Sequence, residues 1–120
     1  MADNAWTTEM FQSIDAKDTE RFLAFLTEEA QFCFGNALPR LGRQDIAALL
    51  AGFFASIKAL RHDVLNTWTV PDYVLCQETV TYTRHDGSTL SVPFVDVFSM
   101  RGTLVKDYLI YVDASHLYAV

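Results

Sequence analysis

The second half of the chain, residues 60–116, most strongly limits what this sequence can fold into. It reads as four strand-like segments joined by short turns, which are marked by Pro71-Asp72, Asp86-Gly87 and Arg101-Gly102. Such pairs interrupt extended segments and favour tight reversals of the chain. Residues 60–116 are therefore expected to form an antiparallel meander.

Four polar side chains fall where the alternation within these segments calls for apolar ones: His62, Glu78, Asp96 and Lys106. A half-buried strand normally alternates apolar and polar residues, so polar groups on the apolar face need an explanation. A sheet curled around a pocket supplies one, because pockets combine apolar walls with a few polar groups. The meander therefore predicts a small-molecule site.

The turns also predict which residues share a face. A three-residue loop at residues 85–87, with Gly87 in the left-handed conformation, pairs Glu78 with Phe94 and Cys76 with Asp96. Similar loops at residues 71–73 and 100–102 would give the pairs Trp68–Cys76, His62–Tyr82, Asp96–Lys106 and Phe94–Tyr108. Each register could slip by one residue. The opposite, Thr-rich face, with Val95, Val97, Leu109 and Tyr111 among its members, is expected to pair with a second copy of the chain.

The first half reads as helical. Apolar residues recur at helical spacing over residues 6–14, and Asp18 is a good N-cap for a second helix that carries Phe22, Phe25 and Leu26. Residues 31–34 suggest a short strand. The clearest helical stripe spans residues 46–57 and must be buried, and the sheet is the only partner large enough. The prediction is an α+β fold over residues 1–120, a single domain with N-terminal helices on a strongly bent antiparallel sheet that encloses a pocket.

Composition narrows the class of protein. With 120 residues and a hydrophobic fraction of 51%, the chain can form a packed core. The formal net charge of -6 argues against binding to nucleic acid or to anionic membranes. The polar, acidic start and the lack of a long apolar run predict a cytoplasmic location. Cys33 and Cys76 lie in apolar segments without metal-ligand spacing, so we expect reduced thiols and no metal site.

Asp96 and His62 are the candidate catalytic residues. Asp96 interrupts an apolar segment, where burial would raise the pKa of its carboxyl group and suit it to general acid or base work. The alternative is a structural acid that is satisfied by Lys106 or by backbone groups. His62 can exchange a proton near neutral pH, or it can be a core histidine with a hydrogen-bonded ring.

Other residues are candidates for substrate binding. Glu78 lies near Asp96 in the proposed register, and two carboxyl groups in one apolar pocket push their pKa values apart. Tyr82 and Tyr108 could donate to a substrate oxygen or simply pack. Trp68, Phe94 and the helix residue Phe53 would give the pocket its shape. Arg40 and Arg43 could attract an anionic ligand, although loop arginines are usually solvated.

With these residues laid out, the chain resembles the nuclear transport factor 2-like superfamily in its SnoaL-like branch. The resemblance rests on the order of the N-terminal helices and of residues 35–43, 60–64, 82–87, 92–97 and 110–113. It implies a cone-shaped α+β barrel, frequent homodimers through the sheet, and chemistry by proton transfer without metal or cofactor. Members include polyketide cyclases, epoxide hydrolases, ketosteroid isomerase-like and dehydratase-like enzymes, and many proteins of no known activity.

The resemblance carries over only in part. Asp96 matches the aspartate of an Arg-x-Asp strand motif in the epoxide hydrolases and cyclases, but the arginine position is Phe94 here. A second family aspartate falls on Ile110, and the last aspartate of that ending is Asp113. Epoxide opening by an Asp-Arg-Asp arrangement is therefore not expected.

Two functions follow from these residues. The first is a cofactor-independent enzyme that isomerises, cyclises or dehydrates a hydrophobic small molecule, with Asp96 and His62 as an acid/base pair. The second is a non-catalytic ligand-binding or dimerisation domain on the same scaffold.

Overall fold

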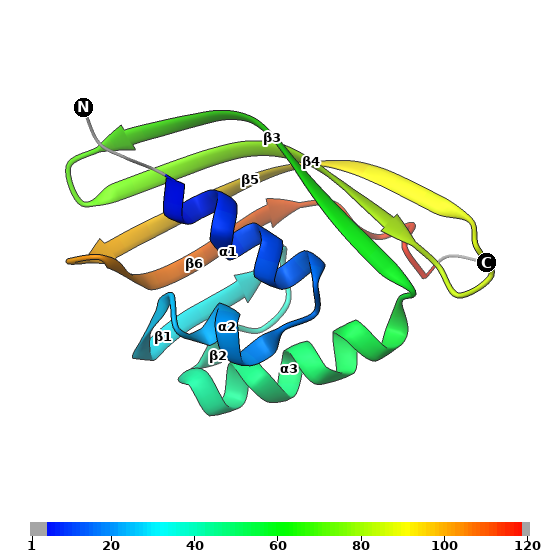
Figure 1. The fold of residues 1–120 in the computed structure, drawn as a ribbon, viewed down its shortest axis with the longest axis horizontal. Helices are drawn as coiled ribbons and strands as arrows, with labels where there is room; N and C mark the ends of the chain where they lie inside the picture. Colours follow the sequence, from blue (N-terminus) through cyan, green and yellow to red (C-terminus); the bar gives the residue numbers. More distant parts are fainter. Residues whose placement is uncertain (1–4, 119–120) are drawn as a thin grey trace.

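Three helices lie along one side of a curved six-stranded sheet in the computed structural model, which describes residues 5–118 (Figure 1). The elements are α1 (Ala5–Asp15), α2 (Thr19–Leu23), β1 (Leu26–Phe34), β2 (Arg40–Leu41), α3 (Arg43–Ser56), β3 (Ala59–Val70), β4 (Tyr73–Thr83), β5 (Thr89–Arg101) and β6 (Leu104–Val112). The predicted α+β fold, with helices first and a meander after them, is confirmed.

The strand order is β2-β1-β6-β5-β4-β3. β1 pairs with β6 in parallel, whereas the other pairs are antiparallel, so the expected all-antiparallel sheet is wrong at this one pair. β2 and β3 form the two edges, so the sheet does not close into a barrel. The sheet curves around the helices (Figure 1). The concave side that results is the only face of the sheet that the helices cover (Figure 1).

Each helix begins or ends at a residue with a clear physical role. Asp18 caps α2 as predicted, because its side chain accepts from the backbone N–H of Arg21 at 3.2 Å. The helix stops at Leu23, however, and Leu26 opens β1 instead of continuing the helix. Lys17 donates to the carbonyls of Phe54 and Ile57 at 2.9 and 2.8 Å, which satisfies the end of α3.

The register of β4 and β5 agrees with the prediction. Glu78 pairs with Phe94 and Cys76 with Asp96, and Gly87 has a φ of 88° in the connecting loop. Arg84 and Ser88 close this loop through a backbone hydrogen bond of 2.8 Å. A three-residue loop with a left-handed glycine thus fixed which residues of the hairpin face the helices.

The predicted register of β3 and β4 is wrong. The turn between them has two residues, Pro71 and Asp72, and a bulge at Leu65 shifts the pairing. His62 therefore pairs with Val80 instead of Tyr82, and Trp68 pairs with Leu75. Because one extra residue reverses the orientation of every side chain beyond it, the end of β3 presents its other face to the helices.

The predicted register of β5 and β6 is also wrong. The turn is formed by Gly102 and Thr103, and a second bulge falls at Lys106. Asp96 pairs with Ile110, and Phe98 pairs with Tyr108. Lys106 is exposed, so it does not neutralise Asp96 as one of the alternatives required.

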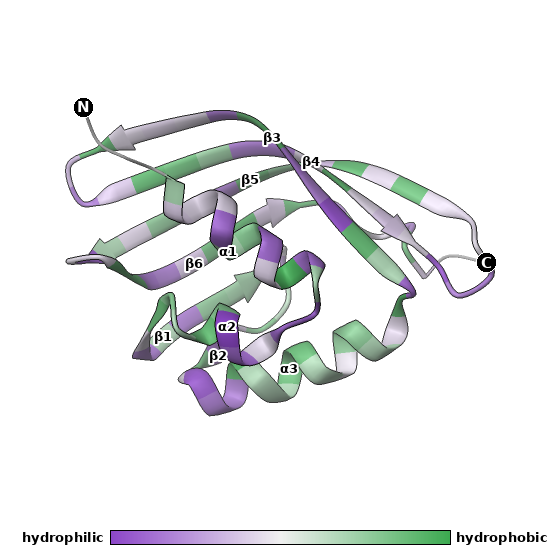
Figure 2. Ribbon diagram, in the orientation of Figure 1, coloured by the Kyte–Doolittle hydropathy of each residue, from purple (hydrophilic) through white to green (hydrophobic). Residues whose placement is uncertain are grey.

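Hydrophobic residues alternate with polar ones along the long strands, and the apolar members meet the helices in one core (Figure 2). Met10, Phe22 and Phe98 are fully buried there. Cys33 and Cys76 are both free; Cys76 is buried as expected, whereas Cys33 is half-buried. No helix within residues 5–118 is long and apolar enough to cross a membrane.

Candidate functional site

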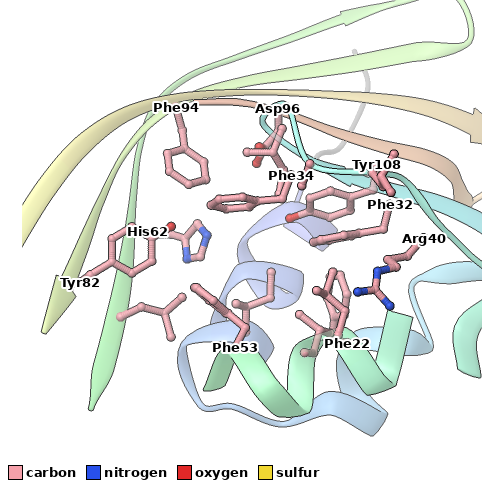
Figure 3. Close-up of a pocket in the computed structure, with 17 residues that line it drawn as sticks. Phe22, Phe32, Phe34, Arg40, Phe53, His62, Tyr82, Phe94, Asp96 and Tyr108 are labelled. Atoms are coloured by element: carbon pink, nitrogen blue, oxygen red, sulfur yellow. The ribbon is translucent and has the colours of Figure 1, made fainter. Parts of the chain in front are cut away.

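A cavity of about 370 Å³ lies between the helices and the concave face of the sheet (Figure 3). Its wall is mostly aromatic and aliphatic, from Ile14, Phe22, Phe32, Phe34, Ala37, Leu38, Leu49, Leu50, Phe53, Leu60, Phe94 and Ile110. The polar lining residues are Arg40, His62, Tyr82, Asp96 and Tyr108. An apolar wall with a few polar groups has the composition of a small-molecule pocket.

The structure brings together most of the residues that the sequence singled out. Phe53, His62, Tyr82, Phe94, Asp96 and Tyr108 all line the cavity. Glu78 lies on the same face of the sheet but is not part of the lining, and it is buried. Phe53 comes from α3 and meets the ring of Tyr82 edge-on at 5.9 Å, so helix and sheet share one wall.

Trp68 is not part of this site. It lies on the outer face of β3 and is 49% exposed, because the bulge at Leu65 turns it away from the helices. The alternation of apolar residues in β3 gave no sign of the bulge, so sequence reasoning placed Trp68 on the wrong face.

His62 is held by Asp15, the last residue of α1. Its Nδ1 lies 2.6 Å from one carboxylate oxygen of Asp15, and its backbone N–H donates to the other oxygen at 3.0 Å. β3 is an edge strand, so that N–H would otherwise lack a partner. Asp15 therefore favours the tautomer with the proton on Nδ1 and leaves Nε2 free to accept.

Aromatic rings fix the plane of the His62 imidazole. Phe11 stacks on it with a centroid distance of 4.9 Å and an interplanar angle of 14°. Phe94 meets it edge-on at 6.3 Å. The side chain is only 6% exposed, so it has little freedom to reorient.

The free side of the imidazole faces Glu78. Nε2 of His62 lies 3.8 Å from Oε1 of Glu78, which is within reach for electrostatic attraction but too long for a hydrogen bond. The predicted partner of His62 was Asp96. The structure instead places the ring between two other carboxyl groups, those of Asp15 and Glu78.

Glu78 and Asp96 form a buried pair of carboxyl groups, each 1% exposed. Apart from the other member of the pair, no donor within residues 5–118 forms a hydrogen bond with any of their four oxygens. If both carboxyl groups were ionised, none of the four oxygens would have a hydrogen-bond donor. One shared proton between the groups removes this conflict.

Burial raises the pKa of both carboxyl groups above their ordinary values. For Glu78, the negative charge of Asp96 raises the pKa further, and the nearby His62 lowers it in part. For Asp96, the neighbouring carboxyl group of Glu78 partly opposes the effect of burial. The pair therefore titrates as a unit that keeps one proton where ordinary carboxyl groups have lost theirs.

Three neighbouring groups stay neutral. Burial raises the pKa of the Tyr82 and Tyr108 phenols, so both remain hydrogen-bond donors at neutral pH. Burial likewise raises the pKa of the Cys76 thiol to about 12, which makes it a poor nucleophile.

Arg40 and Arg43 have different roles. Arg43 donates from Nε at 3.1 Å, and also from Nη2, to the carbonyl of Leu26, so it ties α3 to β1. Arg40 lines the cavity and pairs with Asp45 through Nη1 at 3.2 Å. Only Arg40 is therefore placed to meet a ligand.

Asp15 was missed by sequence reasoning. It ends an amphipathic helix 47 positions before His62, and acids at such positions are common surface residues. No local pattern pointed to it.

Within residues 5–118, no group of three His, Cys, Asp or Glu side chains is arranged to hold a metal ion.

Comparisons with known proteins agree with this architecture. The model of the SnoaL-like domain matches residues 7–108, and the chain therefore belongs to the SnoaL-like domain family. No curated protein gives a significant match.

Several solved structures share the fold. One is a hypothetical protein from Catenulispora acidiphila with a ketosteroid isomerase-like fold, in complex with trimethylamine. It has a TM-score of 0.86 and 13% identity, over 95% of this chain and 89% of that one. TerC co-crystallised with polyporic acid has a TM-score of 0.82 and 18% identity, over 93% and 92%.

A proposed SnoaL-like polyketide cyclase from Jannaschia sp. CCS1 has a TM-score of 0.80 and 18% identity, over 92% of this chain and 85% of that one. At these identities the similarity shows the fold alone. The family model confirms the SnoaL-like part of the resemblance that the sequence suggested. The chemistry has to be argued from the residues of the site.

Proposed function

We propose that this protein is an enzyme that moves a proton within a hydrophobic, carbonyl-bearing small molecule, without a metal or cofactor. The observation that carries the proposal is the buried Glu78–Asp96 pair, whose member Asp96 lines an apolar cavity. A desolvated carboxylate is a stronger base than one in water, which suits it to take a proton from carbon.

Asp96 accepts a proton from the carbon next to the substrate carbonyl, and the bonding electrons move to form an enolate. The oxygen that becomes negative accepts a hydrogen bond from a neutral phenol, Tyr82 or Tyr108. The carboxyl group of Asp96 then returns the proton to another carbon of the enolate, which gives isomerisation. In a cyclisation, the enolate carbon first attacks a second carbonyl carbon of the substrate, and the proton goes to the alkoxide that this attack forms. In a dehydration, the enolate re-forms its carbonyl and expels a β-hydroxyl group, which takes the proton and leaves as water.

His62 has a supporting role in this scheme. With Nδ1–H directed at Asp15, its Nε2 faces Glu78 across 3.8 Å, so the imidazole acts on the carboxyl pair through electrostatic attraction. Through this contact, His62 partly lowers the pKa of the Glu78 carboxyl group.

A ligand-binding domain without catalysis is the second candidate. Phe94 and Ile110 both line the cavity at the positions where the resemblance places an arginine and an aspartate. An apolar residue at each position removes two charged groups from the site. This supports a binding function, or a proton transfer that needs fewer charges than epoxide opening.

Deuterium exchange tests the two candidates without knowledge of the natural substrate. Hydrophobic aryl ketones such as 2-acetylnaphthalene are incubated with the protein in D₂O, and mass spectrometry follows exchange of the hydrogens next to the carbonyl. The enzyme should accelerate exchange, and Asp96→Asn should abolish the acceleration without lowering the melting temperature. Binding without exchange would favour the second candidate, and strong destabilisation of Asp96→Asn would indicate a structural carboxyl group.

A further inference from the structure

The two ends of the cavity differ in their exposure to solvent. Leu38, in the loop before β2, is 86% exposed although it lines the cavity, so this end is the mouth. Asp96 and Tyr108 are each 1% exposed and form the inner end. A ligand that enters at the mouth therefore meets the carboxyl pair last.

Arg40 is the only Lys or Arg among the described residues that line the cavity. Its position is fixed by the backbone, because Arg40 pairs with Phe32 between β2 and β1. The guanidinium lies on the side of the cavity away from His62 and Tyr82 (Figure 3). The site thus has a positive group at one side, and elsewhere in its wall lies Asp96, a member of the carboxyl pair with net negative charge.

The contact with Asp45 leaves much of the guanidinium available. Asp45 accepts two hydrogen bonds: its Oδ1 accepts one from Nη1 of Arg40, and its Oδ2 accepts one from the backbone N–H of Leu41. This arrangement orients the Arg40 side chain but occupies only one of its nitrogens. A planar guanidinium has five N–H donors, so Nη2 and Nε can still bind an anionic oxygen.

Electrostatics would orient a ligand with an acidic group. Such a group is repelled by the carboxyl pair and loses hydration if it is buried in the apolar part of the cavity. At the mouth it stays partly hydrated and meets Arg40, whose side chain is 42% exposed. The apolar body then fills the cavity, and a carbonyl at the other end reaches Asp96.

We propose that Arg40 binds an acidic group of the ligand at the mouth of the cavity, so that the substrates of this site are hydrophobic carbonyl compounds that carry a carboxylate or an ionised enol or phenol. This inference rests on the proposed function for the role of Asp96 and adds the substrate class. It also assigns Arg40 a role in specificity.

Two probes of equal shape and different charge test the inference. Binding of 2-naphthoate and of the neutral 2-acetylnaphthalene is measured by isothermal titration calorimetry at neutral pH and low salt. Arg40→Gln should weaken naphthoate about fivefold to tenfold, as expected for a charge-assisted hydrogen bond at a half-exposed site, and leave acetylnaphthalene unchanged. Arg40→Lys should retain most of the affinity, and Arg101→Gln, on an exposed hairpin, is the matched control.

Asp45→Asn provides a change in the opposite direction. Asn can still accept from the Leu41 N–H but no longer competes as an anion for Arg40. Naphthoate should therefore bind more tightly to this variant, and the effect should shrink as salt is added.

The outcomes separate the two proposals. If Arg40→Gln weakens both probes equally, or neither, Arg40 is not an anion anchor, whereas the proposed proton transfer is untouched. If neither probe binds the wild-type protein, or if binding leaves the NMR signals of the His62 ring unchanged, the probes do not occupy the cavity. Both proposals would then be overturned.

Discussion

The imidazole Nδ1 of His62 lies 2.6 Å from a carboxylate oxygen of Asp15, a residue at the end of α1. The second oxygen of Asp15 accepts the backbone N–H of His62 at 3.0 Å. One carboxylate therefore fixes both the position of the β3 backbone and the orientation of the ring. The contact links the helical layer to the polar part of the cavity.

The first prediction concerns the tautomer of His62. In the wild-type protein, two-dimensional ¹H–¹⁵N NMR of the imidazole should show the proton on Nδ1. Asp15→Asn should weaken this preference, because the amide can also donate to the ring, and should reduce the deuterium-exchange rate by about tenfold to a hundredfold, as for loss of other residues that orient a functional histidine.

Asp15→Ala separates positioning from stability. It leaves the buried N–H and the ring of His62 without a partner, which should cost about 1–3 kcal/mol of unfolding free energy. Asp15→Asn should lose less stability than this. If Asp15→Asn loses as much stability as Asp15→Ala and keeps full exchange activity, Asp15 has only a structural role.

The structure also shows how much of this site the sequence could predict. The β4–β5 register followed from one glycine in a three-residue loop, which placed Glu78 opposite Phe94 correctly. Asp96 was recognisable because a charged residue in an apolar strand requires compensation. Features of this kind can be predicted from the sequence because they depend on residues that are close together in the chain.

The missed features depend on residues far apart in the chain. The bulge at Leu65 decided the placement of Trp68, and the bulge at Lys106 helped to decide the register of β5 and β6. The contact between Asp15 and His62 spans 47 positions and requires α1 to pack against an edge strand. Spacing along the sequence carries no information on either feature.

The second prediction concerns the pH dependence of stability. The pKa of Glu78 lies above its ordinary value of 4.5 and that of Asp96 above 3.8, so the folded protein keeps protons that the unfolded chain releases. Stability from this pair is therefore greatest below about pH 4 and declines as the pH rises, until the folded pair has itself titrated. The double variant Glu78→Gln/Asp96→Asn should thus gain stability over wild type, by about 2 kcal/mol more at about pH 8 than at about pH 4.

Asp86→Asn is a control of opposite sign for this prediction. Hydrogen bonds from Ser88 lower the pKa of Asp86, so its contribution is present above its ordinary value of 3.8 and lost as the pH falls. Urea titrations of wild type and variants across the pH range give the differences. A gain in the double variant that is independent of pH would show that Glu78 and Asp96 titrate in the folded protein as they do in the unfolded chain.

The third prediction separates the two tyrosines. Tyr82 and Tyr108 both line the cavity, and burial raises the pKa of both phenols. The phenol that donates to the substrate oxygen should be identified by Tyr→Phe substitution at each position. One variant should lose about a hundredfold or more in exchange rate, as for loss of an oxyanion donor, and the other should change little.

Binding of 2-acetylnaphthalene provides the check on this pair of variants. Because a donor to the enolate acts mainly in the transition state, its loss should reduce the rate with little change in affinity. Two variants with full activity would remove the phenols from the mechanism. A parallel loss of affinity and rate would indicate that the hydroxyl group positions the ground state.

The last prediction concerns the outer face of the sheet, which we propose is the contact between two copies of the chain. Trp68, Leu75, Val97 and Leu109 lie in one cross-strand row on this face. Trp68 is 49% exposed and Tyr111, also on this face, is 60% exposed. Leu75, Val97 and Leu109 are half-buried. Partly exposed apolar groups that are contiguous across several strands indicate a protein–protein contact. Val97→Lys places a charge in the middle of the row and should convert a dimer to monomer in light scattering after size-exclusion chromatography.

Gln44→Lys, which adds the same charge on the exposed side of α3, should leave the dimer intact. A wild-type protein that is monomeric at micromolar concentration would contradict the proposal. A dimer that persists in Val97→Lys would place the contact elsewhere on the surface.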